Sequence, residues 1–482
     1  MDPTIADDLP LSAFNQLDAS RYPYLLSSSA IGQNNSRYDI LLAFPQFTLT
    51  LDADKTLHCT DPGQDLSGGF LTALDKLLQK DRTPVDEVTG HLPFTGGWFV
   101  YLSYEMAQEI EPCLSLPSLA DSQPSSQPSS QPGSQPLAFA ARCPAAIIFD
   151  KNNDQYMAVA EAGHAHLLDD MERDFIAIRN GGSGITAGEQ KIELQSLTEA
   201  DAQPYLQQVE RIKRYIVDGD IFQANLSRQW QAVLSPDEQG MKPSDAALFD
   251  ALARYNPSSF AALACLPGMT IISSSPERLV SLKDGIVETR PIAGTRPRHD
   301  DQQSDEALAE ELLAHPKEQA EHIMLIDLER NDLGRVCRPG SIEVNELMVL
   351  ESWQHVHHIV SNVRGKLEEG KSPVDVLRAM FPGGTITGCP KVRCIEILAE
   401  MEQQARGAYT GSLGYINNDG SMDFNILIRT MVRDSVDGQD RLTFRAGGGI
   451  VSDSIAEREL EETRAKAKGL LKMFQMKVPD NT

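Results

Sequence analysis

Several features that assign a protein to a common class are missing from this sequence. Its seven cysteines are scattered, odd in number and without a Cys-x-x-Cys pair, which indicates reduced thiols and argues against a zinc site. There is no Gly-x-Cys-x-Gly segment, so the chain lacks the nucleophile elbow of a class I glutaminase. The segment Gly383–Lys391 resembles a phosphate loop, but Cys389 and Pro390 interrupt the Gly-Lys-Ser/Thr ending of the Walker pattern, so an NTPase is not indicated.

Long apolar runs are missing as well. No stretch of about 18 uninterrupted apolar residues occurs, which excludes a membrane-spanning helix. Residues 1–3 open an acidic segment that has neither a basic stretch nor an apolar run. A secretory signal is therefore not indicated, and we expect a cytoplasmic protein.

Basic residues are scarce compared with acidic ones. The chain has 43 Lys and Arg residues against 69 Asp and Glu residues, which gives a formal net charge of −26. An acidic surface repels phosphate backbones and anionic lipids, so nucleic acids and membranes are poor partners. The same field repels small anions. An acidic substrate would therefore need a pocket that is locally basic or holds a metal ion.

The 482 residues, 41% of them hydrophobic, are enough for a large core. Residues 1–190 form a β-rich region in which 38–44, 47–51 and 96–102 read as strands. Between 115 and 136 the triplet Ser-Gln-Pro recurs, and we expect a disordered insertion there because such a segment has nothing to bury.

A cluster of Gly and polar residues near 180–188 separates this region from a second predicted domain over 200–475. There Leu206, Val209, Ile212 and Ile216 recur at helical spacing, and a charged helix is expected over 455–473. Strands and helices intermix throughout, so the order predicts an α+β or mixed α/β fold.

Two predicted helices each carry a pair of glutamates three positions apart, Glu318 with Glu321 and Glu459 with Glu462. Residues at this spacing share a helix face, so each pair can direct two carboxylates to one point. A small number of hard oxygen ligands suits Mg²⁺, which keeps waters and takes further ligands from a substrate. Solvated pairs of this kind are also expected by chance in so acidic a chain.

Two further features suit a carboxylate ligand. Gly447–Gly449 follow a strand-like run, and consecutive glycines let backbone N–H groups approach an anion, although a plain turn is an equal alternative. Arg429 lies in an apolar segment, Ile426–Val432, that reads as one strand. An inward guanidinium there needs an anion, whereas an outward one on an edge strand does not. His357 and His358, with His355 nearby, point to opposite faces of a strand and are not expected to share a metal.

Several ordered blocks, taken together, resemble the chorismate-utilising family from about Tyr205 to Phe474. They are Ile221–Ser227, Ser275–Arg278, Pro291–Pro297, Asp327–Asp332, Gly384–Lys391 and Glu459–Lys466. The resemblance implies the fold of anthranilate synthase, in which β-sheets pack face to face between flanking helices.

The resemblance also implies roles for individual residues. Glu321 and Glu462 match the Mg²⁺ ligands, with Glu318 and Glu459 near the metal or its waters, and the metal would bind the ring carboxylate of chorismate. A bound dication would explain how a dianion enters an acidic protein. The positions that match the holders of the enolpyruvyl carboxylate are Tyr409, Arg429 and Gly447–Gly449, with Lys466 balancing the local carboxylates. Those that match the lining of the ring are Ala293, Gly294, Thr295, His358 and Thr385.

Two matched residues bear on the reaction type. Glu277 matches the general acid for the C4 hydroxyl, which needs a proton because hydroxide is a poor leaving group. Gln223 stands where the water-using members carry a lysine that activates water at C2. Ammonia needs no such activation, so glutamine indicates an aminating enzyme. Because the chain has no glutaminase elbow, we expect a separate glutamine amidotransferase subunit to supply the ammonia.

The position of amination stays open between two branches of the family. Ser36–Ile40, Gly96–Glu105 and Phe424–Thr430 resemble aminodeoxychorismate synthases, which make 4-amino-4-deoxychorismate for 4-aminobenzoate and folate. Ala293 resembles the anthranilate synthases, because many members of the first branch carry a lysine there. We favour the aminodeoxychorismate branch over anthranilate formation. A non-catalytic paralogue that binds only a ligand or a partner is a third hypothesis, which the retained acid, metal ligands and clamp disfavour.

Overall fold

The computed structural model describes residues 9–28, 37–83, 90–119, 135–180, 192–237, 239–299, 301–352, 356–436 and 438–474. Of the predicted insertion over 115–136, residues 120–134 lie outside the described residues, as does His355. None of the described helices combines the length and hydropathy of a membrane span.

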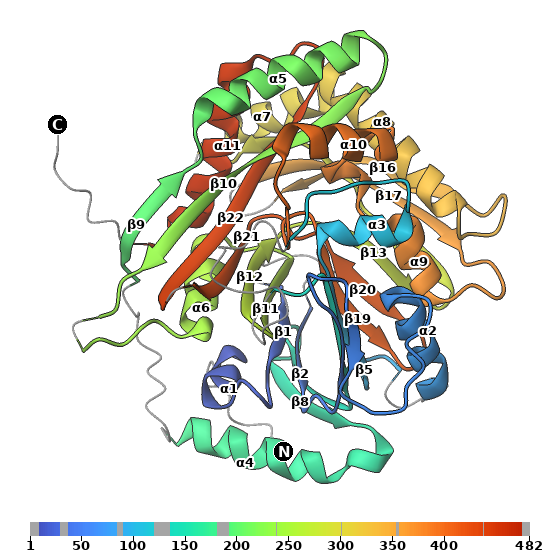
Figure 1. Ribbon diagram of the computed structural model, residues 1–482, viewed down its shortest axis with the longest axis vertical. Helices are drawn as coiled ribbons and strands as arrows, with labels where there is room; N and C mark the ends of the chain where they lie inside the picture. The colour runs from blue at the N-terminus through green and yellow to red at the C-terminus, as the bar shows by residue number, and fades with distance from the viewer. Residues whose placement is uncertain are drawn as a thin grey trace.

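Two sheets of eleven strands each form the centre of the molecule (Figure 1). In order across the first sheet, the strands are β18 (Gly388–Cys389), β10 (Gln223–Leu234), β22 (Gln439–Ile450), β21 (Thr430–Val436), β12 (Met269–Ser275), β11 (Phe260–Leu266), β1 (Tyr24–Ser27), β2 (Tyr38–Ala43), β7 (Ala145–Asp150) and β8 (Gln155–Ala160), with β9 (Leu194–Glu199) also paired to β10.

Across the second sheet the order is β15 (Ile292–Pro297), β17 (Val356–Lys366), β14 (Ile286–Thr289), β13 (Arg278–Lys283), β20 (Met422–Asn425), β19 (Ser412–Asn417), β5 (Gly97–Leu102), β6 (Ala138–Cys143), β3 (Thr48–Leu51) and β4 (Leu57–Cys59), with β16 (Glu343–Ser352) also paired to β17. Strands from before residue 190 and after residue 200 are hydrogen-bonded within both sheets, as where β5 pairs with β19. The division into domains over 1–190 and 200–475 therefore stays a prediction.

The inner faces of the two sheets pack on each other. One hydrophobic cluster combines Leu42 and Ile148 of the first sheet with Phe99 and Phe139 of the second, all buried. The ring of Tyr24 stacks on that of Phe99 across this layer, with 4.0 Å between the ring centroids. Such interdigitating apolar faces are what hold two sheets together.

Helices cover the outer faces of both sheets. Those on the second sheet are α2 (Phe70–Asp81), α8 (Pro316–Gly334) and α9 (Pro373–Met380), with α7 (Gln302–Ala314) beside β15. Those on the first sheet are α1 (Ser12–Leu17), α4 (His166–Arg179) and α6 (Asp245–Tyr255). The short α3 (Ala107–Ile110) packs near α10 (Lys391–Glu402). The arrangement confirms the predicted α+β fold with face-to-face sheets and flanking helices.

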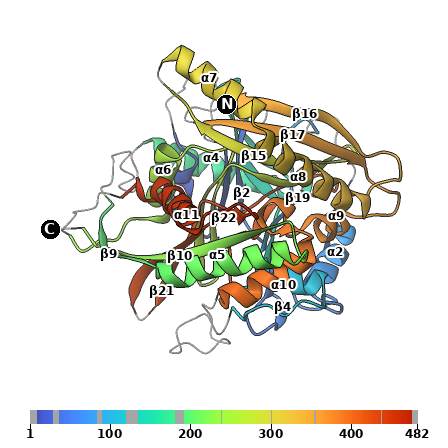
Figure 2. The same cartoon turned by 90° about the horizontal axis from the view of Figure 1, so that it is seen from above.

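Three helices surround the long strands β10 and β22, which carry much of the site described below. They are α5 (Ala202–Val217), α10 and α11 (Ala456–Leu471), and Figure 2 shows them gathered around these strands. The predicted helical spacing is confirmed in α5, which buries Val209 and Ile212 and begins with the Asp201 side chain accepting from the N–H of Gln203. Gly219 follows its end with a φ of 83°, as a helix-terminating glycine does.

Candidate active site

Two short connections carry the chain from one sheet to the other, and they lie side by side. One links β12 to β13 and contains Glu277, and the other links β20 to β21 and contains Arg429. The backbone N–H of Ile426 donates to the carbonyl of Glu277 at 3.0 Å, and that of Ser274 donates to the carbonyl of Arg429 at 3.1 Å. These bonds fix Glu277 and Arg429 next to each other where the sheets meet.

Arg429 takes a left-handed backbone conformation with a φ of 52°. The prediction of one strand over 426–432 is therefore wrong, because β21 begins only at Thr430. A left-handed residue turns the chain away from the strand direction, and here it lets the segment cross between the sheets. Burial lowers the pKa of the Arg429 guanidinium, and the nearby Glu277 carboxylate opposes that shift.

Glu277 is buried, with 6% of its surface exposed. The hydroxyl of Thr385 donates to its Oε1 at 2.7 Å. Burial raises the pKa of Glu277 to about 7, although this hydrogen bond and the charges of Arg429 and Lys466 act in the opposite direction. A large fraction of this carboxyl is therefore protonated near neutral pH, which is what a general acid requires.

The glycines Gly447–Gly449 continue strand β22 and pair with Asn225–Ser227 of β10. The alternative of a plain turn is wrong, because the ladder of β22 runs through all three residues. Binding of an anion by their backbone N–H groups stays a prediction. The role of glycine here is close approach rather than a special φ angle.

Side chains from three directions reach these glycines. A Cβ on Gly447 would lie 2.7 Å from the Tyr409 hydroxyl, and a Cβ on Gly449 would lie 2.3 Å from Nε2 of Gln223. On the other face of the strand, a Cβ on Gly448 would lie 3.1 Å from Oε2 of Glu459. The absence of side chains at Gly447 and Gly449 therefore allows Gln223 and Tyr409 to face the same stretch of backbone.

Helix α11 places its charged residues over the same stretch. Lys466 Nζ donates to the carbonyl of Gly447 at 2.8 Å and lies 2.8 Å from Oε1 of Glu462. Glu459 accepts a 2.7 Å hydrogen bond from the Ser454 hydroxyl. The carboxylates of Glu459 and Glu462 both lie near the position of a Cβ on Gly448, so this predicted pair does converge.

The other glutamate pair lies on α8, against the second sheet. Oε1 of Glu318 lies 3.3 Å from Nη1 of Arg296, and its Oε2 lies 2.9 Å from the position of a Cβ on Gly294. Glu321 follows one turn later and is half-buried. Gly294 takes a φ of 66°, a left-handed conformation that favours glycine, and a Cβ there would need the Glu318 carboxylate to move.

Within the part of the chain that the structure describes, no three His, Cys, Asp or Glu side chains converge as a complete protein-only metal site requires. Mg²⁺ does not require one, because it commonly binds to one or two carboxylates and completes its shell with water and substrate oxygens. The convergence of Glu459 and Glu462 and their hard oxygen donors fit this ion.

The strands β15 and β17 contribute the remaining predicted positions. Ala293 pairs with Ile359 and Thr295 with His358, around an irregularity at Gly294; the side chain of Thr295 lies outside the described part. His358 is buried, and burial lowers its pKa to about 4, so its ring is neutral near pH 7. His357 bonds instead to Ser352 and Asp305, which confirms that the two histidines face opposite ways.

Comparison with known proteins assigns the family. Residues 25–472 match the model of the chorismate binding enzymes. The chain belongs to this chorismate-binding enzyme family. It is 46% identical to the aminodeoxychorismate synthase component 1 of Bacillus subtilis, over 97% of this chain and 94% of that protein. It is 37% identical to the anthranilate synthase component 1 of a Synechocystis strain, over 98% of this chain and 94% of that protein.

A solved structure supports the same assignment. Anthranilate synthase component I from Streptococcus pneumoniae superposes with a TM-score of 0.75 at 29% identity, over 91% of this chain and 93% of that one. The predicted resemblance to the family and the predicted fold are confirmed, and the chain is a chorismate-utilising enzyme.

This chorismate-binding enzyme also contains a buried network of ion pairs around Glu402, which was not predicted from the sequence. The Glu402 carboxylate lies 2.7 Å from Arg406 and 3.1 Å from Arg445, and accepts from the Ser227 hydroxyl at 2.8 Å. The network contacts β22 through Arg445 and β10 through Ser227. The signal in the sequence was the basic Arg445 between the apolar Phe444 and Ala446 in a strand-like run, with Glu402 and Arg406 at helical spacing.

A second buried cluster lies behind the turn that carries Thr385. Glu329 and Asp332 are both buried on α8, and Lys391 forms an ion pair with Asp332. Burial, and then the charge of Asp332, raise the pKa of Glu329 above its usual value. The family resemblance covered this segment but implied no role for Glu329.

Proposed function

We propose that this chain is component I of an aminodeoxychorismate synthase. In this proposal it aminates chorismate at C4 with the help of Mg²⁺, and a separate glutamine amidotransferase subunit supplies the ammonia. The single observation that supports amination, rather than the addition of water, is the position of Gln223.

Gln223 is buried at the start of β10 and directs its amide toward Gly449. Its Oε1 accepts no hydrogen bond from the described residues. An amide cannot take a proton from water, so the side chain is unsuited to activating a hydroxyl nucleophile. A free carbonyl oxygen can accept an N–H, which suits the binding of ammonia.

The other site residues supply the proton and bind the substrate. Glu277 donates its proton to the C4 hydroxyl, which leaves as water. The nitrogen that bonds to carbon then loses a proton to solvent, and the Glu277 carboxylate regains one from solvent. Arg429, Tyr409 and the backbone of Gly447–Gly449 hold the enolpyruvyl carboxylate, since a guanidinium and N–H groups are strong carboxylate donors. Gly294, Thr385 and the neutral His358 line the ring.

Glu462 and Glu321 would hold Mg²⁺, with Glu459 and Glu318 close to it. The ion supplies positive charge for the ring carboxylate of chorismate. Lys466 keeps Glu462 near the Gly447 backbone, and it partly offsets the repulsion that four carboxylates impose on an anionic substrate.

The choice of C4 rests on likeness to relatives. The Bacillus subtilis aminodeoxychorismate synthase is more similar to this chain, at 46% identity, than the Synechocystis anthranilate synthase, at 37% identity over a similar span. Ala293 favours the second candidate, anthranilate synthase component I, because it offers no side-chain nucleophile for a covalent step at C2. If C4 is aminated, this chain does so without a lysine at position 293.

Incubation of the purified chain with chorismate, Mg²⁺ and an ammonium salt at alkaline pH tests the proposal. 4-Aminobenzoate that appears only after the matching lyase is added would support C4 amination. Fluorescent anthranilate with pyruvate would establish the second candidate instead. A folded chain that gives no product at any ammonia concentration would contradict both.

A further inference from the structure

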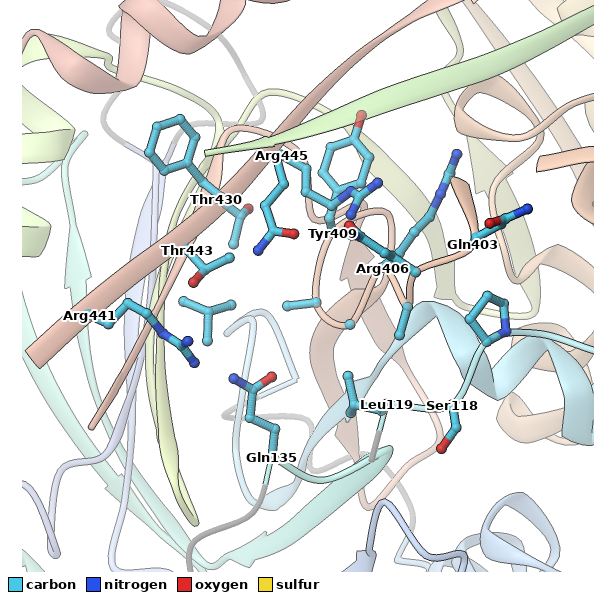
Figure 3. A pocket seen from close by; sticks show the side chains of 18 residues that line it. Ser118, Leu119, Gln135, Gln403, Arg406, Tyr409, Thr430, Arg441, Thr443 and Arg445 are labelled. Atoms are coloured by element: carbon cyan, nitrogen blue, oxygen red, sulfur yellow. The ribbon is translucent and has the colours of Figure 1, made fainter. Parts of the chain in front are cut away.

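A cavity of about 440 Å³ lies beside the proposed carboxylate clamp, between β10, β22 and the segment that follows α10. Figure 3 shows the side chains that line it, with Arg441, Thr443 and Arg445 on β22 and with Arg406 and Tyr409 from the segment after α10. The volume falls within the range of small-molecule sites. Of the residues proposed to hold the enolpyruvyl carboxylate, Tyr409 lines this cavity, whereas Arg429 and Gly447–Gly449 are not among its described lining residues.

The cavity wall is basic in an acidic protein. Three arginines line it, and among the described residues that line it none is acidic. Arg406 and Arg445 share the Glu402 carboxylate, and Arg441 pairs with Asp434 at 2.7 Å. The buried carboxyl of Glu105 also lies at Arg406, because the backbone N–H of Arg406 donates to its Oε1 at 2.7 Å. The guanidinium groups of the wall therefore already have carboxyl neighbours, all of which lie outside the described lining.

Arg445 has hydrogen-bonding capacity left over. Its Nε donates to the Ser227 hydroxyl at 3.0 Å and its Nη2 to Glu402 at 3.1 Å. Its Nη1 is buried and has no partner among the described residues, and Arg445 is 6% exposed. A buried charged donor without an acceptor is costly, so a shift of the Arg445 side chain that brings Nη1 to an acceptor in the cavity would be favourable.

We propose that this cavity is a second small-molecule site that binds a small anion through a carboxylate or phosphate group. Arg445 supplies the charge and the unused donor, since a guanidinium binds such groups strongly. Gln229 lies directly opposite Arg445 in the β10–β22 pairing and also lines the cavity. Its amide and the Thr443 hydroxyl add neutral hydrogen-bonding groups.

Isothermal titration of the full chain with inorganic phosphate and with malonate, at constant ionic strength and without Mg²⁺, tests this site. We expect saturable binding of at least one anion, one per chain. Binding of phosphate alone indicates a phosphate ligand, and binding of malonate alone indicates a carboxylate. The assay needs no turnover, so its result is independent of the proposed reaction.

Two acidic substitutions in the wall locate the bound anion. Gln229→Glu gives Arg445 an internal carboxylate, and we expect the anion to bind at least about tenfold more weakly, the effect of losing one charge-assisted hydrogen bond. If that variant does not fold, Thr443→Asp serves the same purpose, with Thr443→Asn as its neutral match that keeps binding. Arg429→Asn should also keep binding.

Three results would overturn the proposal. One is the absence of saturable binding of either anion to the folded chain. The second is unchanged binding in the folded acidic variants. The third is loss of binding in Arg429→Asn, which would place the anion in the substrate clamp instead.

Discussion

The Thr385 hydroxyl donates a 2.7 Å hydrogen bond to Oε1 of Glu277, the buried carboxyl with a pKa of about 7. This bond favours the ionised form of the carboxyl, whereas burial favours the protonated form. The balance between burial and this hydrogen bond sets the pKa of Glu277, and therefore the pH above which its carboxyl is mostly ionised. Because a general acid works only when protonated, we expect kcat/KM for chorismate to fall as pH rises through about 7, at a fixed concentration of free ammonia.

Removing the Thr385 hydroxyl should move the decline of kcat/KM to higher pH. Thr385→Val deletes a bond that stabilises the ionised carboxyl, so the pKa of Glu277 rises and the decline begins at higher pH. Thr385→Ser keeps the hydroxyl and should keep the wild-type profile. Profiles of kcat/KM from pH 6 to 9 would test this. A downward shift in the valine variant, or an equal shift in both, would contradict the assignment.

Arg429 should contribute mainly to binding of the substrate. Asparagine tolerates the left-handed backbone better than most residues, so Arg429→Asn removes the guanidinium with little added strain at φ of 52°. Loss of one charge-assisted carboxylate contact costs about 1.5–3 kcal/mol, so kcat/KM for chorismate should fall about 10- to 100-fold. Steady-state kinetics would measure this. An unchanged kcat/KM in the folded variant would remove Arg429 from the clamp.

The proposed metal site predicts different effects for substitutions of two neighbouring glutamates on α11. Glu462→Ala should abolish Mg²⁺-dependent turnover, because it removes one of the two carboxylates that converge near Gly448. Glu461→Ala is the matched control, since its exposed side chain pairs only with Arg464 among the described contacts. Activity measured against Mg²⁺ concentration distinguishes them. Equal Mg²⁺ dependence in both variants would contradict the role of Glu462.

Much of this site could be read from the sequence, and the reasons for the errors are physical. Helical spacing placed each glutamate pair on one helix face correctly, because period 3.6 is a local property. The strand predicted through Arg429 failed because apolar residues continue across the crossing between sheets, and only the left-handed φ of Arg429 ends the ladder. Nor did the sequence reveal that Gly447–Gly449 stay in β22, because their partners on β10 lie about 220 residues earlier.

Gly449 should be required for the position of Gln223 rather than for stability of the fold. A Cβ there would lie 2.3 Å from Gln223 Nε2, so Gly449→Ala must displace that side chain. We expect turnover to fall at least about tenfold, since a 1 Å misplacement is enough for such losses. Gly469→Ala is the control, because a Cβ at that helical glycine meets no atom within 4 Å. Wild-type turnover in Gly449→Ala would show that Gln223 needs no such contact.

The Glu402 network should contribute to stability far more than a surface ion pair does. The Glu402 side chain is 3% exposed and faces both Arg406 and Arg445, so Glu402→Gln leaves buried guanidinium charge uncompensated. We expect a loss of about 3–5 kcal/mol in the free energy of unfolding. Glu400→Gln, in the exposed pair with Arg211, should cost only about 0–1 kcal/mol.

Urea unfolding at several pH values would measure both effects. Burial raises the pKa of Glu402, but the charges of Arg406 and Arg445 outweigh it and hold the pKa below its usual value. A depressed pKa means that the folded state binds the proton less readily than the unfolded chain. The stability contributed by Glu402 is therefore present at neutral pH and is lost as pH falls through its folded pKa. The difference between wild type and Glu402→Gln should shrink in acid, and a difference that grows instead would contradict the ion-pair role.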